Sequence, residues 1–530
     1  MVVSAHPDAS RIGAQIIADG GNAVDAAVAV EFALAVCHPT AGNIGGGGFM
    51  VIRLNDGSLD AIDFREKAPG AASRDMYLDE KGEVVDGMST NTHLASGVPG
   101  TVDGMVQAHA RYGKLPWERV IQPAIDLAMN GFIVAGKQAS SLNSMKRTFL
   151  RRNQGEVRFV REIPWREGDT LRQPELANTL MLIRDNGRAG FYEGVTADLV
   201  VREMQRGNGI ITHEDLSNYK SQWRVPLTGK YRDEYTIISM APPSSGGVAL
   251  LQLLGMTGNH NLKEMGFMTA ESIHLMAEAE RRVYADRAEY LGDPDFYDVP
   301  VEALLKGEYL TGRMSDFNAD SATPSSQISH GSIQMTESEE TTHFSVVDTE
   351  GNAVSVTTTL NGGYGNGIVV EGAGFLLNNE MDDFSVKAGV PNMFGLVGGV
   401  ANEITPGKRM LSSMTPTIVE KNGELFMVLG SPGGSTIITS VFQVIVNVID
   451  FEMSISGAVD AGRFHHQWLP DYISHEKGVI DSILMAKLIS KGHQLRDRES
   501  IGRVDAILVL PDKKLSGAAD PRGDDRACGF

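Results

Sequence analysis

The sequence contains little cysteine and is short of positive charge. Only Cys37 and Cys528 occur in the 530 residues, and no CxxC pair is present, so neither a disulfide framework nor a zinc knot is expected. The 47 Lys and Arg residues are outnumbered by 67 Asp and Glu residues, and the net charge of −20 argues against nucleic acid and anionic membranes as partners. Hydrophobic residues make up 42% and charged residues 22%, which is ordinary for a globular enzyme.

Long apolar runs are also missing. The longest run, Ala23 to Cys37, is interrupted by Asp25 and Glu31, so it is too short and too charged to span a bilayer. It is predicted to be a buried helix that holds Cys37 as a buried thiol. The N-terminal sequence MVVSAHPDAS lacks the basic and apolar regions of a signal peptide, as would a sequence from which a signal had been removed.

Glycine is frequent, but it does not form a nucleotide-binding motif. The segment 41–50, AGNIGGGGFM, has neither the GxxxxGK[ST] pattern nor Rossmann spacing, so it predicts a close crossing of two backbones and no bound cofactor. The segment 429–436, LGSPGGST, offers two interpretations. Gly433 and Gly434 form either a plain strand-to-helix turn or a pair of backbone N–H donors for an oxyanion.

Local patterns indicate a chain that mixes helices and strands. The predicted elements before residue 136 are a helix capped by Ser10 and ended by Gly20-Gly21-Asn22, a buried helix from Val24 to Val36, and strands from Phe49 to Arg53 and from Ala61 to Phe64. Helical patterns dominate from Pro116 to Asp320, for example from Ser272 to Glu289. Residues 319–340 are polar and poor in aromatics, which indicates an exposed, flexible segment.

The stretch 337–347, ESEETTHFSVV, changes abruptly from an acidic run to the alternating pattern of a strand. It is either an ordinary loop-to-strand junction or the place where the chain is cut to make Thr341 an N-terminus. The following residues predict a β-hairpin that turns at Glu350-Gly351, and facing residues in such a hairpin have numbers that sum to about 700. Thr341 is therefore expected to face Thr359, with Asn361 on the same face.

A threonine at a new N-terminus would carry its own general base. Its α-amine has a pKa of about 7.7–8, so a useful fraction is neutral near pH 7 and can activate the hydroxyl group. The same hydroxyl can make the cut by attacking the carbonyl of Glu340, after which water hydrolyses the ester. One side chain would then serve both maturation and turnover.

The chain resembles the gamma-glutamyltranspeptidases in a series of motifs that follow one another along nearly its whole length. The matching segments are GGNAVDAAVA (20–29), GNIGGGGFM (42–50), FREKAP (64–69), LASGVPG (94–100), PPSSGG (242–247), YADRAEYLGDPDF (284–296), TTHFSVVD (341–348), TLN (359–361), NNEMDDFS (378–385), LSSM (411–414) and SPGGS (431–435). The resemblance implies the N-terminal nucleophile hydrolase fold, an α+β four-layer αββα sandwich. It also implies autocleavage between Glu340 and Thr341 into a large subunit, 1–340, and a small catalytic subunit, 341–530, which form one αββα body as a heterodimer.

The resemblance also implies an activity. It is the removal of γ-glutamyl groups from glutathione and related amides, with transfer to water or to an amino acid or dipeptide acceptor. The partners implied are these small molecules, without a cofactor, a metal, nucleic acid or a membrane span. Export to the periplasm or the cell exterior is implied as well, because family members normally begin with a secretion signal.

Residue roles carry over where the motifs align. The implied catalytic residues are Thr341 as the nucleophile, Thr359 as the group that orients it, and Gly433 and Gly434 as oxyanion donors. The implied clamp for the substrate α-carboxylate consists of Arg65, Ser412 and Ser413, since a guanidinium fits a carboxylate bidentately. The implied receptor for the substrate α-ammonium consists of Asn361, Glu380 and Asp383.

Several alternatives stay open at this point. Arg65 could instead form a surface ion pair with Glu66, and Met381-Asp382-Asp383 could be a solvated turn or a helix N-cap. Phe394 stands where the lid loop of the family, here Pro391 to Arg409, often has a tyrosine, so a lid hydrogen bond is missing and gating is expected to be looser. The rival functions are a glutaryl-cephalosporin acylase of the same fold and an uncleaved, non-catalytic homologue.

Overall fold

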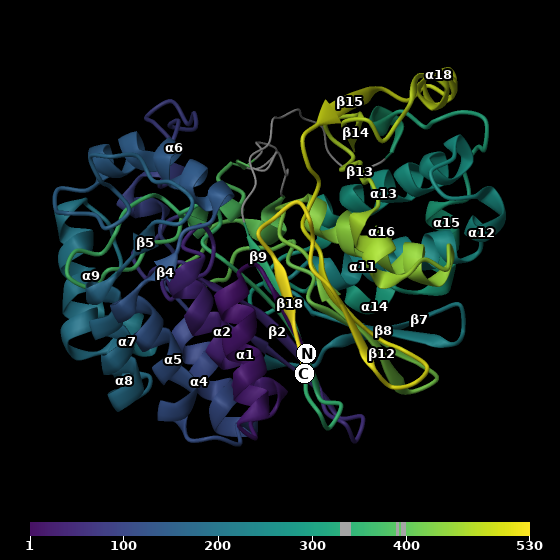
Figure 1. The fold of residues 1–530 in the computed structure, drawn as a ribbon. Helices are drawn as coiled ribbons and strands as arrows, with labels where there is room; N and C mark the ends of the chain where they lie inside the picture. Colours follow the sequence, from purple (N-terminus) through teal and green to yellow (C-terminus); the bar gives the residue numbers. More distant parts are fainter. Residues whose placement is uncertain (329–340, 388–391, 394–398) are drawn as a thin grey trace.

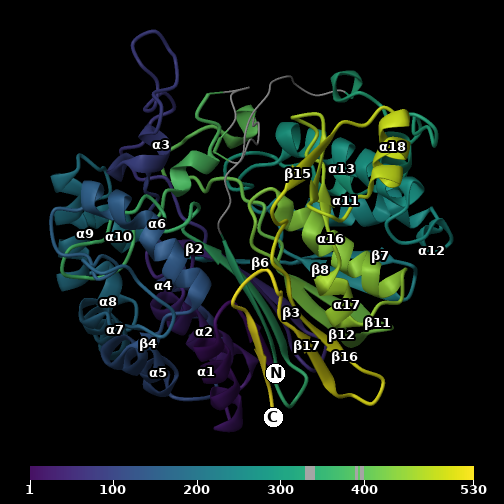
Figure 2. The same ribbon diagram turned by 45° about the horizontal axis from the view of Figure 1, so that its top comes forward.

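The computed structural model describes residues 1–328, 341–387, 392–393 and 399–530. Two β-sheets lie face to face, and helices cover the outer face of each sheet (Figures 1 and 2). Both chain termini lie together at one end of the sandwich (Figure 1). This arrangement is the four-layer αββα sandwich of the α+β class, as the family resemblance implies.

The first sheet contains the β-hairpin that begins after Thr341. Within the described residues it has seven strands, each antiparallel to its neighbours. In order across the sheet they are β18 (Arg526–Cys528), β1 (Val2–Ser4), β9 (Thr342–Val347), β10 (Ala353–Thr359), β2 (Gly47–Arg53), β3 (Leu59–Asp63) and β6 (Gln222–Arg224). The hairpin strands β9 and β10 therefore lie near the middle of the sheet, where they are paired on both sides.

The second sheet stacks on the first through contacts of β12 with β9 and β10. Across the part of the chain that the structure describes, its six strands in order are β17 (Leu515–Ala518), β16 (Asp505–Val509), β12 (Glu424–Gly430), β11 (Thr417–Lys421), β8 (Tyr235–Ser239) and β7 (Leu227–Tyr231). Two smaller sheets consist of β13 (Phe464–His465), β14 (Ile473–Glu476) and β15 (Leu495–Arg498), and of β4 (Phe132–Ile133) and β5 (Thr170–Leu171).

The helices divide between the two outer layers in chain order (Figure 1). On the side of the first sheet lie α1 (Pro7–Ala18), α2 (Ala23–Cys37), α3 (Met88–Asn91), α4 (Thr101–Tyr112), α5 (Trp117–Asn130), α6 (Gly136–Arg152), α7 (Pro174–Asn186), α8 (Ala189–Tyr192), α9 (Gly194–Arg206) and α10 (His213–Asn218). On the side of the second sheet lie α11 (Gly246–Gly258), α12 (Leu262–Met265), α13 (Ala270–Tyr290), α14 (Val301–Leu304), α15 (Gly307–Arg313), α16 (Thr436–Ile449), α17 (Ile455–Asp460) and α18 (Ser482–Ser490). Short 3₁₀ helices are η1 (His93–Ala95), η2 (Ser325–Gln327), η3 (Glu380–Asp383) and η4 (Val400–Asn402).

Three apolar cores separate the four layers. One lies between the first sheet and its helices, and it includes the buried residues of α2. A second lies between the sheets and includes Phe49, Val51 and Ile418. The third lies between the second sheet and α11, α13 and α16. Because α2 has a core on all sides, all of its residues are buried, which accounts for a helix that is apolar around its whole circumference.

The predicted elements near the N-terminus are present, with one correction. Helix α2 begins at a capping box in which Asn22 and Asp25 exchange side-chain and backbone hydrogen bonds. The prediction that Ser10 caps the first helix was wrong, because α1 begins at Pro7 after His6, whose side chain accepts a hydrogen bond from Asp8 N. Ser10 lies inside the helix and donates to the carbonyl of Arg526 at 2.7 Å.

Other predictions have mixed outcomes. Strands β2 and β3 and helix α13 lie where they were predicted, and Cys37 is a fully buried free thiol. Strands β6, β7 and β8 were not predicted, because they lie inside the region read as mainly helical. Of the segment 319–340, predicted to be exposed, residues 329–340 lie outside the described residues; within the rest, Ser325 and Ile328 are buried.

Candidate active site

The β9–β10 hairpin has the register that the sequence predicts. Thr342 pairs with Thr358 and Val347 with Ala353, so facing positions sum to 700 and Thr341 enters the hairpin next to Thr359. Gly351 has a φ of +88° at the turn, a conformation that favours glycine. Thr341 and Thr359 line one narrow cavity, of about 20 Å³, at the open end of the hairpin.

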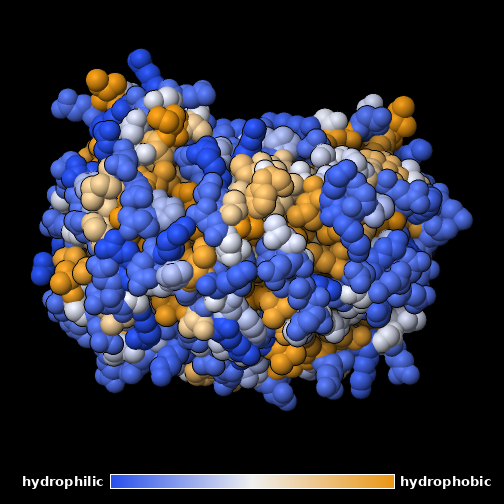
Figure 3. All heavy atoms as spheres, turned by 60° about the horizontal axis from the view of Figure 1, so that its bottom comes forward, coloured by the Kyte–Doolittle hydropathy of each residue, from blue (hydrophilic) through white to orange (hydrophobic). Residues whose placement is uncertain are grey.

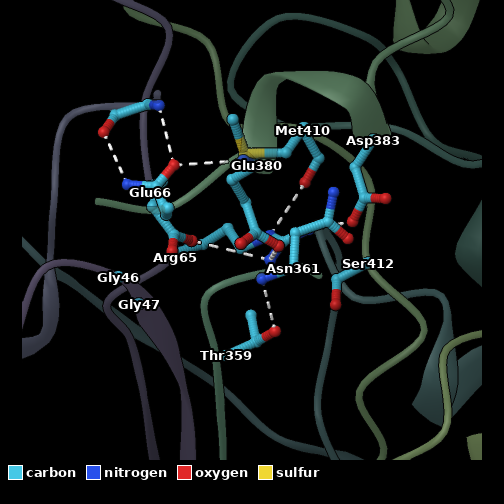
Figure 4. A network of polar contacts seen from close by, with 12 residues as sticks. Gly46, Gly47, Arg65, Glu66, Thr359, Asn361, Glu380, Asp383, Met410 and Ser412 are labelled. Carbon is cyan, nitrogen blue, oxygen red and sulfur yellow. Dashed lines mark hydrogen bonds and ion pairs between the residues drawn. The ribbon is translucent and has the colours of Figure 1, made fainter. Parts of the chain in front are cut away.

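This first cavity brings together most of the residues singled out in the sequence. Its lining consists of Arg65, Arg287, Thr341, Thr359, Asn361, Glu380, Asp383, Ser412, Ser413, Met414, Gly434 and Ile437. These residues come from distant parts of the chain, and Figure 4 shows several of them pointing toward one another. The convergence of Arg65, Glu380 and Asp383 on Thr341 is a long-range result of the fold.

Asn361 reaches the first cavity by a different route from the one predicted. Strand β10 ends at Thr359, and Asn361 has a φ of +72°, so strand alternation does not place it. Instead its backbone N–H donates to Thr359 Oγ1 at 2.8 Å, and its Nδ2 donates to the carbonyl of Asn379 at 2.9 Å. A sharp turn after the strand therefore positions this side chain.

The glycine-rich segment 41–50 crosses β10 beside the first cavity, as predicted. Gly47 pairs with Thr359 in the sheet. A Cβ atom on Gly46 would lie 2.0 Å from the carbonyl oxygen of Thr359, so a side chain is excluded there. Asn43 fixes the crossing, because its Nδ2 donates to the same carbonyl at 2.9 Å and its Oδ1 accepts from Gly46 N. These glycines thus allow two backbones to touch where Thr359 is held.

Arg65 lies at the centre of a buried ion cluster (Figure 4). Its guanidinium donates to Glu380 and to Asp383, and it lies 3.5 Å from Glu66. Arg65, Glu66 and Glu380 are at most 1% exposed, so the surface ion pair considered from the sequence is not what forms. In this structure the cation of the predicted carboxylate clamp is bound to the carboxylates of the predicted ammonium receptor.

Burial and crowding shift the ionisation of this cluster. Burial raises the pKa of Asp383 to about 6 and that of Glu66 to about 7, although the charge of Arg65 opposes both shifts. Burial also raises the pKa of Glu380 well above its ordinary range. Because three carboxyl groups surround one guanidinium, the cluster favours holding a proton near neutral pH or taking up a second cation.

The segment that carries Glu380 and Asp383 is the 3₁₀ helix η3. It is largely buried, so the solvated turn considered from the sequence does not occur. Asn378 anchors its start by accepting from Glu380 N at 3.0 Å and by donating to the carbonyl of Gly97. Asn402 donates to the carbonyl of Asp383 at 2.6 Å, which fixes its other end.

Ser412 and Ser413 lie on a loop that packs against the start of α11. Ser245 donates from both its backbone N–H and its hydroxyl to the carbonyl of Ser412, at 2.7 and 2.6 Å. Arg287 of α13 donates to Ser413 Oγ at 3.1 Å and to Ser245 Oγ at 2.9 Å. The serine pair is therefore held by residues of the PPSSGG and YADRAEY segments.

Arg287 is a cavity residue that the sequence predictions missed. It is 5% exposed, lines the first cavity, and has its pKa lowered to about 10 by burial and by Arg65, although Tyr284 and Asp383 oppose the shift. Its presence in the motif YADRAEYLGDPDF was a usable signal. The motif alone did not show that α13 passes behind Ser413, so no role was predicted for it.

Gly433 and Gly434 form the turn between β12 and α16, which was one of the two interpretations of LGSPGGST. They have φ values of +128° and +52°, so both require conformations that favour glycine. Gly434 lines the first cavity, whereas Gly433 lines a second cavity together with Thr341. Both glycines precede the N-terminus of α16, whose dipole favours negative charge.

Two predicted residues lie outside the described residues. They are Glu340, on the far side of the predicted cleavage bond, and Phe394 of the predicted lid.

A wider cavity of about 790 Å³ lies away from Thr341, between hairpin turns that include Glu350, Gly423 and Lys513. It opens near the chain termini, and Figure 3 shows the molecule from the side where that end comes forward, with hydrophilic residues predominating.

Comparisons with known proteins give a matching family model, similar sequences and similar solved structures. A family model described as gamma-glutamyltranspeptidase matches residues 9–530. The chain is 49% identical over 533 residues to the glutathione hydrolase proenzyme of Escherichia coli (strain K12), covering 100% of this chain and 92% of the relative. Among solved structures, a cephalosporin acylase from Bacillus halodurans matches with a TM-score of 0.86 at 25% identity, covering 100% of this chain and 95% of that chain. The gamma-glutamyltranspeptidase of Helicobacter pylori matches with a TM-score of 0.61 at 46% identity, covering 63% of this chain and 96% of that chain.

Proposed function

The chain belongs to the gamma-glutamyltranspeptidase family and is an enzyme of the glutathione hydrolase type, and we propose that Thr341 is its nucleophile. The observation that carries the proposal is the convergence of Thr341, Arg65 and Asp383 on the first cavity. A γ-glutamyl group ends in an α-carboxylate and an α-ammonium, and this cavity offers a buried cation and buried carboxylates beside a threonine hydroxyl. The substrate class is therefore γ-glutamyl amides, with glutathione among them.

Binding of the donor exchanges ion pairs inside the first cavity. The substrate carboxylate takes the guanidinium of Arg65 together with the hydroxyls of Ser412 and Ser413, and the substrate ammonium takes Asp383, Glu380 and Asn361. The ion pairs of Arg65 with Glu380 and Asp383 give these charged groups partners, which lowers the cost of burying them.

Catalysis then follows from an N-terminal threonine. The α-amine of Thr341 accepts the hydroxyl proton while Oγ1 attacks the γ-carbonyl, and Thr359 keeps the hydroxyl in place. The oxyanion is stabilised by backbone N–H groups of Gly433 and Gly434 at the start of α16. The leaving amine takes the proton from the α-amine, and water or an acceptor amine later attacks the γ-glutamyl ester and regenerates Thr341.

The free α-amine requires cleavage between Glu340 and Thr341. The products are a large subunit of residues 1–340 and a small subunit of residues 341–530, which is 530 − 340 = 190 residues. The first cavity supports an assembly of both parts, because Arg65 and Arg287 come from one and Thr341 and Asp383 from the other. Residues 1–340 make up about 64% of the 530 residues, which is close to the 63% of this chain that the Helicobacter pylori chain covers.

The acylase alternative is less well supported. A glutaryl side chain has a carboxylate but no α-ammonium, so it would leave Asp383 and Glu380 without a ligand cation. Three carboxyl groups around Arg65, of which Glu66 and Glu380 are fully buried, suit a zwitterion better than an anion. A non-catalytic homologue has no need for Thr341, Thr359 and the glycine pair to meet in adjoining cavities.

The test is an assay of the purified protein on γ-glutamyl p-nitroanilide, with and without glycylglycine. Release of p-nitroaniline that glycylglycine accelerates is the expected result. A denaturing gel of the same sample should show two fragments, the smaller beginning at Thr341. An intact chain without turnover would support a binding protein instead, and preferential turnover of glutaryl amides would support the acylase.

The proposed location is the periplasm or the cell exterior, as the resemblance implies. No helix in the described part of the chain is long and apolar enough to cross a membrane. The proposed partners are glutathione, related γ-glutamyl compounds, and amino acid or dipeptide acceptors. Fractionation of the source cells, followed by the p-nitroanilide assay on each fraction, tests the location.

A further inference from the structure

The methionines around the first cavity differ in their access to solvent. Met414 lines the cavity and is 2% exposed. Met381 lies on η3, the carbonyl of Met410 accepts from Arg65 Nε, and both side chains are fully buried. Met393, by contrast, is partly exposed. A thioether is oxidised where a reagent can reach it, so Met393 is the one of these four side chains that is open to oxidation.

The sulfur of Met393 contacts two amide groups of the site. Its Sδ lies 3.6 Å from Asn361 Nδ2 and 3.6 Å from Asn379 Nδ2. The backbone N–H of Met393 donates to Asp382 Oδ2 at 2.7 Å, which holds this residue beside η3. A Cβ atom on Gly362 would lie 3.3 Å from the methyl carbon of Met393, so the end of the side chain is closely packed as well.

The sulfur contact helps to orient the amide of Asn361. One of the two Nδ2 hydrogens is donated to the carbonyl of Asn379 at 2.9 Å, and Met393 Sδ is a weak acceptor for the other. Because both hydrogens are directed into the protein, the amide oxygen of Asn361 is the polar atom that remains for a ligand. An ammonium group needs an acceptor, so this orientation suits the proposed receptor.

We propose that Met393 is a site of methionine oxidation, and that its oxidation to the sulfoxide weakens binding of the γ-glutamyl donor. The inference rests on the proposed function, in which Asn361 and Asp383 receive the α-ammonium. The oxidant is hydrogen peroxide: the sulfur loses two electrons and gains one oxygen atom, and the peroxide is reduced to water. Methionine sulfoxide reductases restore the thioether, so the modification is reversible.

An oxygen atom on Met393 Sδ has no room beside the two amides. The sulfur already lies at contact distance from both Nδ2 atoms, so the added oxygen displaces the side chain or turns the amide of Asn361. The sulfoxide is also polar and is a stronger hydrogen-bond acceptor than the thioether. Loss of one hydrogen bond to the ammonium should raise KM for the donor roughly three- to tenfold. The described contacts of Met393 are on the ammonium side of the site, so kcat should change little.

The experiment treats the purified enzyme with hydrogen peroxide, maps the sulfoxides by peptide mass spectrometry, and measures kcat and KM for γ-glutamyl p-nitroanilide. In the wild type, oxidation of Met393 should accompany the rise in KM, and methionine sulfoxide reductase should reverse both. Met393→Leu keeps the apolar bulk without the sulfur, so its KM should not respond to peroxide. Met393→Gln places a strong acceptor in the same position, so its KM should be raised before any treatment.

Met129→Leu is the matched control. Met129 lies on α5 and is 42% exposed, so peroxide should oxidise it in the wild type, and its replacement should not protect donor binding. An oxidised Met393 with an unchanged KM, a Met393 that stays reduced while Met129 is oxidised, or an equal response in Met393→Leu would overturn the inference. If Met393→Leu does not fold, the mass spectra and the reversal by the reductase decide.

The untreated wild type separates this inference from the proposed function. An untreated enzyme that releases no p-nitroaniline would overturn the proposed function. Normal turnover that does not respond to oxidation of Met393 would overturn the oxidation site alone.

Discussion

The two cavities that meet at Thr341 differ in the charge that they bury. The first holds Arg65 with three carboxyl groups; Arg65, Glu66 and Glu380 are nearly inaccessible to solvent, and the side chain of Asp383 is 12% exposed. The second is lined by Arg503 and Arg522. The carboxylates that pair with them, Asp525 and Glu476, are not among its lining residues. A site with both signs suits a zwitterion, and a site with positive charge suits an anion. The contrast shows that the two sides of Thr341 differ in the charge of the residues that line them.

Thr341→Ala should have the largest effect, because it removes the group that both cavities share. We expect no fragments on a denaturing gel and a loss of p-nitroanilide turnover of about a thousandfold or more. Thr341→Ser is the control, since it keeps a hydroxyl and should retain cleavage and part of the activity. Fragments of unchanged size from Thr341→Ala would show that another group makes the cut.

Asp383→Asn should act on the first cavity alone. Loss of a charge-assisted hydrogen bond to the α-ammonium should lower kcat/KM for γ-glutamyl p-nitroanilide roughly ten- to a hundredfold. Turnover of a glutaryl anilide, which lacks the ammonium, should fall less or rise. The exposed Asp512→Asn serves as a matched control. Undiminished γ-glutamyl turnover in Asp383→Asn would mean that the ammonium binds elsewhere.

The pH profile should reveal the same carboxylate. The α-amine of Thr341 must be neutral to act as a base, so log kcat/KM should fall with a slope of about one below pH 8. Asp383, whose pKa burial raises to about 6, must be ionised to bind the ammonium, so the slope should steepen to about two below pH 6. Asp383→Asn should keep a slope of one throughout. A second break that persists in this variant would assign it to another group.

Glu31 provides a reference outside both cavities. It is fully buried on α2, it has no ion-pair partner among the described residues, and burial raises its pKa to about 8, against a smaller opposing effect of Thr358. A carboxyl with a raised folded-state pKa binds a proton that the unfolded chain releases. Its contribution to the free energy of unfolding therefore falls as pH rises from about 4.5 to 8 and is constant above that range.

Glu31→Gln should remove this dependence while turnover stays at the wild-type level. Urea denaturation between pH 5 and pH 8 should show a loss of stability with pH that is smaller in the variant, by up to about 1.4 kcal/mol per pH unit. Glu371→Gln, at an exposed position, is the matched control. If the free energy of unfolding depends on pH in the same way in the wild type and in Glu31→Gln, Glu31 is ionised in the folded protein. Burial alone would then not hold a proton on this carboxyl group.

Local rules predicted much of the fold near Thr341. The turn at Gly351 fixes the register of β9 with β10, and this register brings Thr341 beside Thr359. The spacing of residues along the sequence was therefore sufficient to predict that the two threonines lie together. The glycine crossing at Gly46 was likewise predictable, because a run of glycines permits a backbone contact that side chains forbid.

Contacts between distant segments could not be predicted in the same way. Arg287 reaches the first cavity only because α13 packs behind the loop that carries Ser413, and neither helix periodicity nor a motif without structure gives that placement. The ion cluster of Arg65 with Glu380 and Asp383 depends on two segments more than 300 positions apart. Arg503 drew no prediction, since a single arginine after a short strand has no local signature.

The most direct test of this account is the intact mass and N-terminal sequence of the purified protein, measured beside its γ-glutamyl p-nitroanilide activity. The account predicts two chains, of residues 1–340 and 341–530, with Thr341 as the new N-terminus of the active sample. Full activity in an uncleaved chain of 530 residues, or a small chain that begins at another residue, would contradict it.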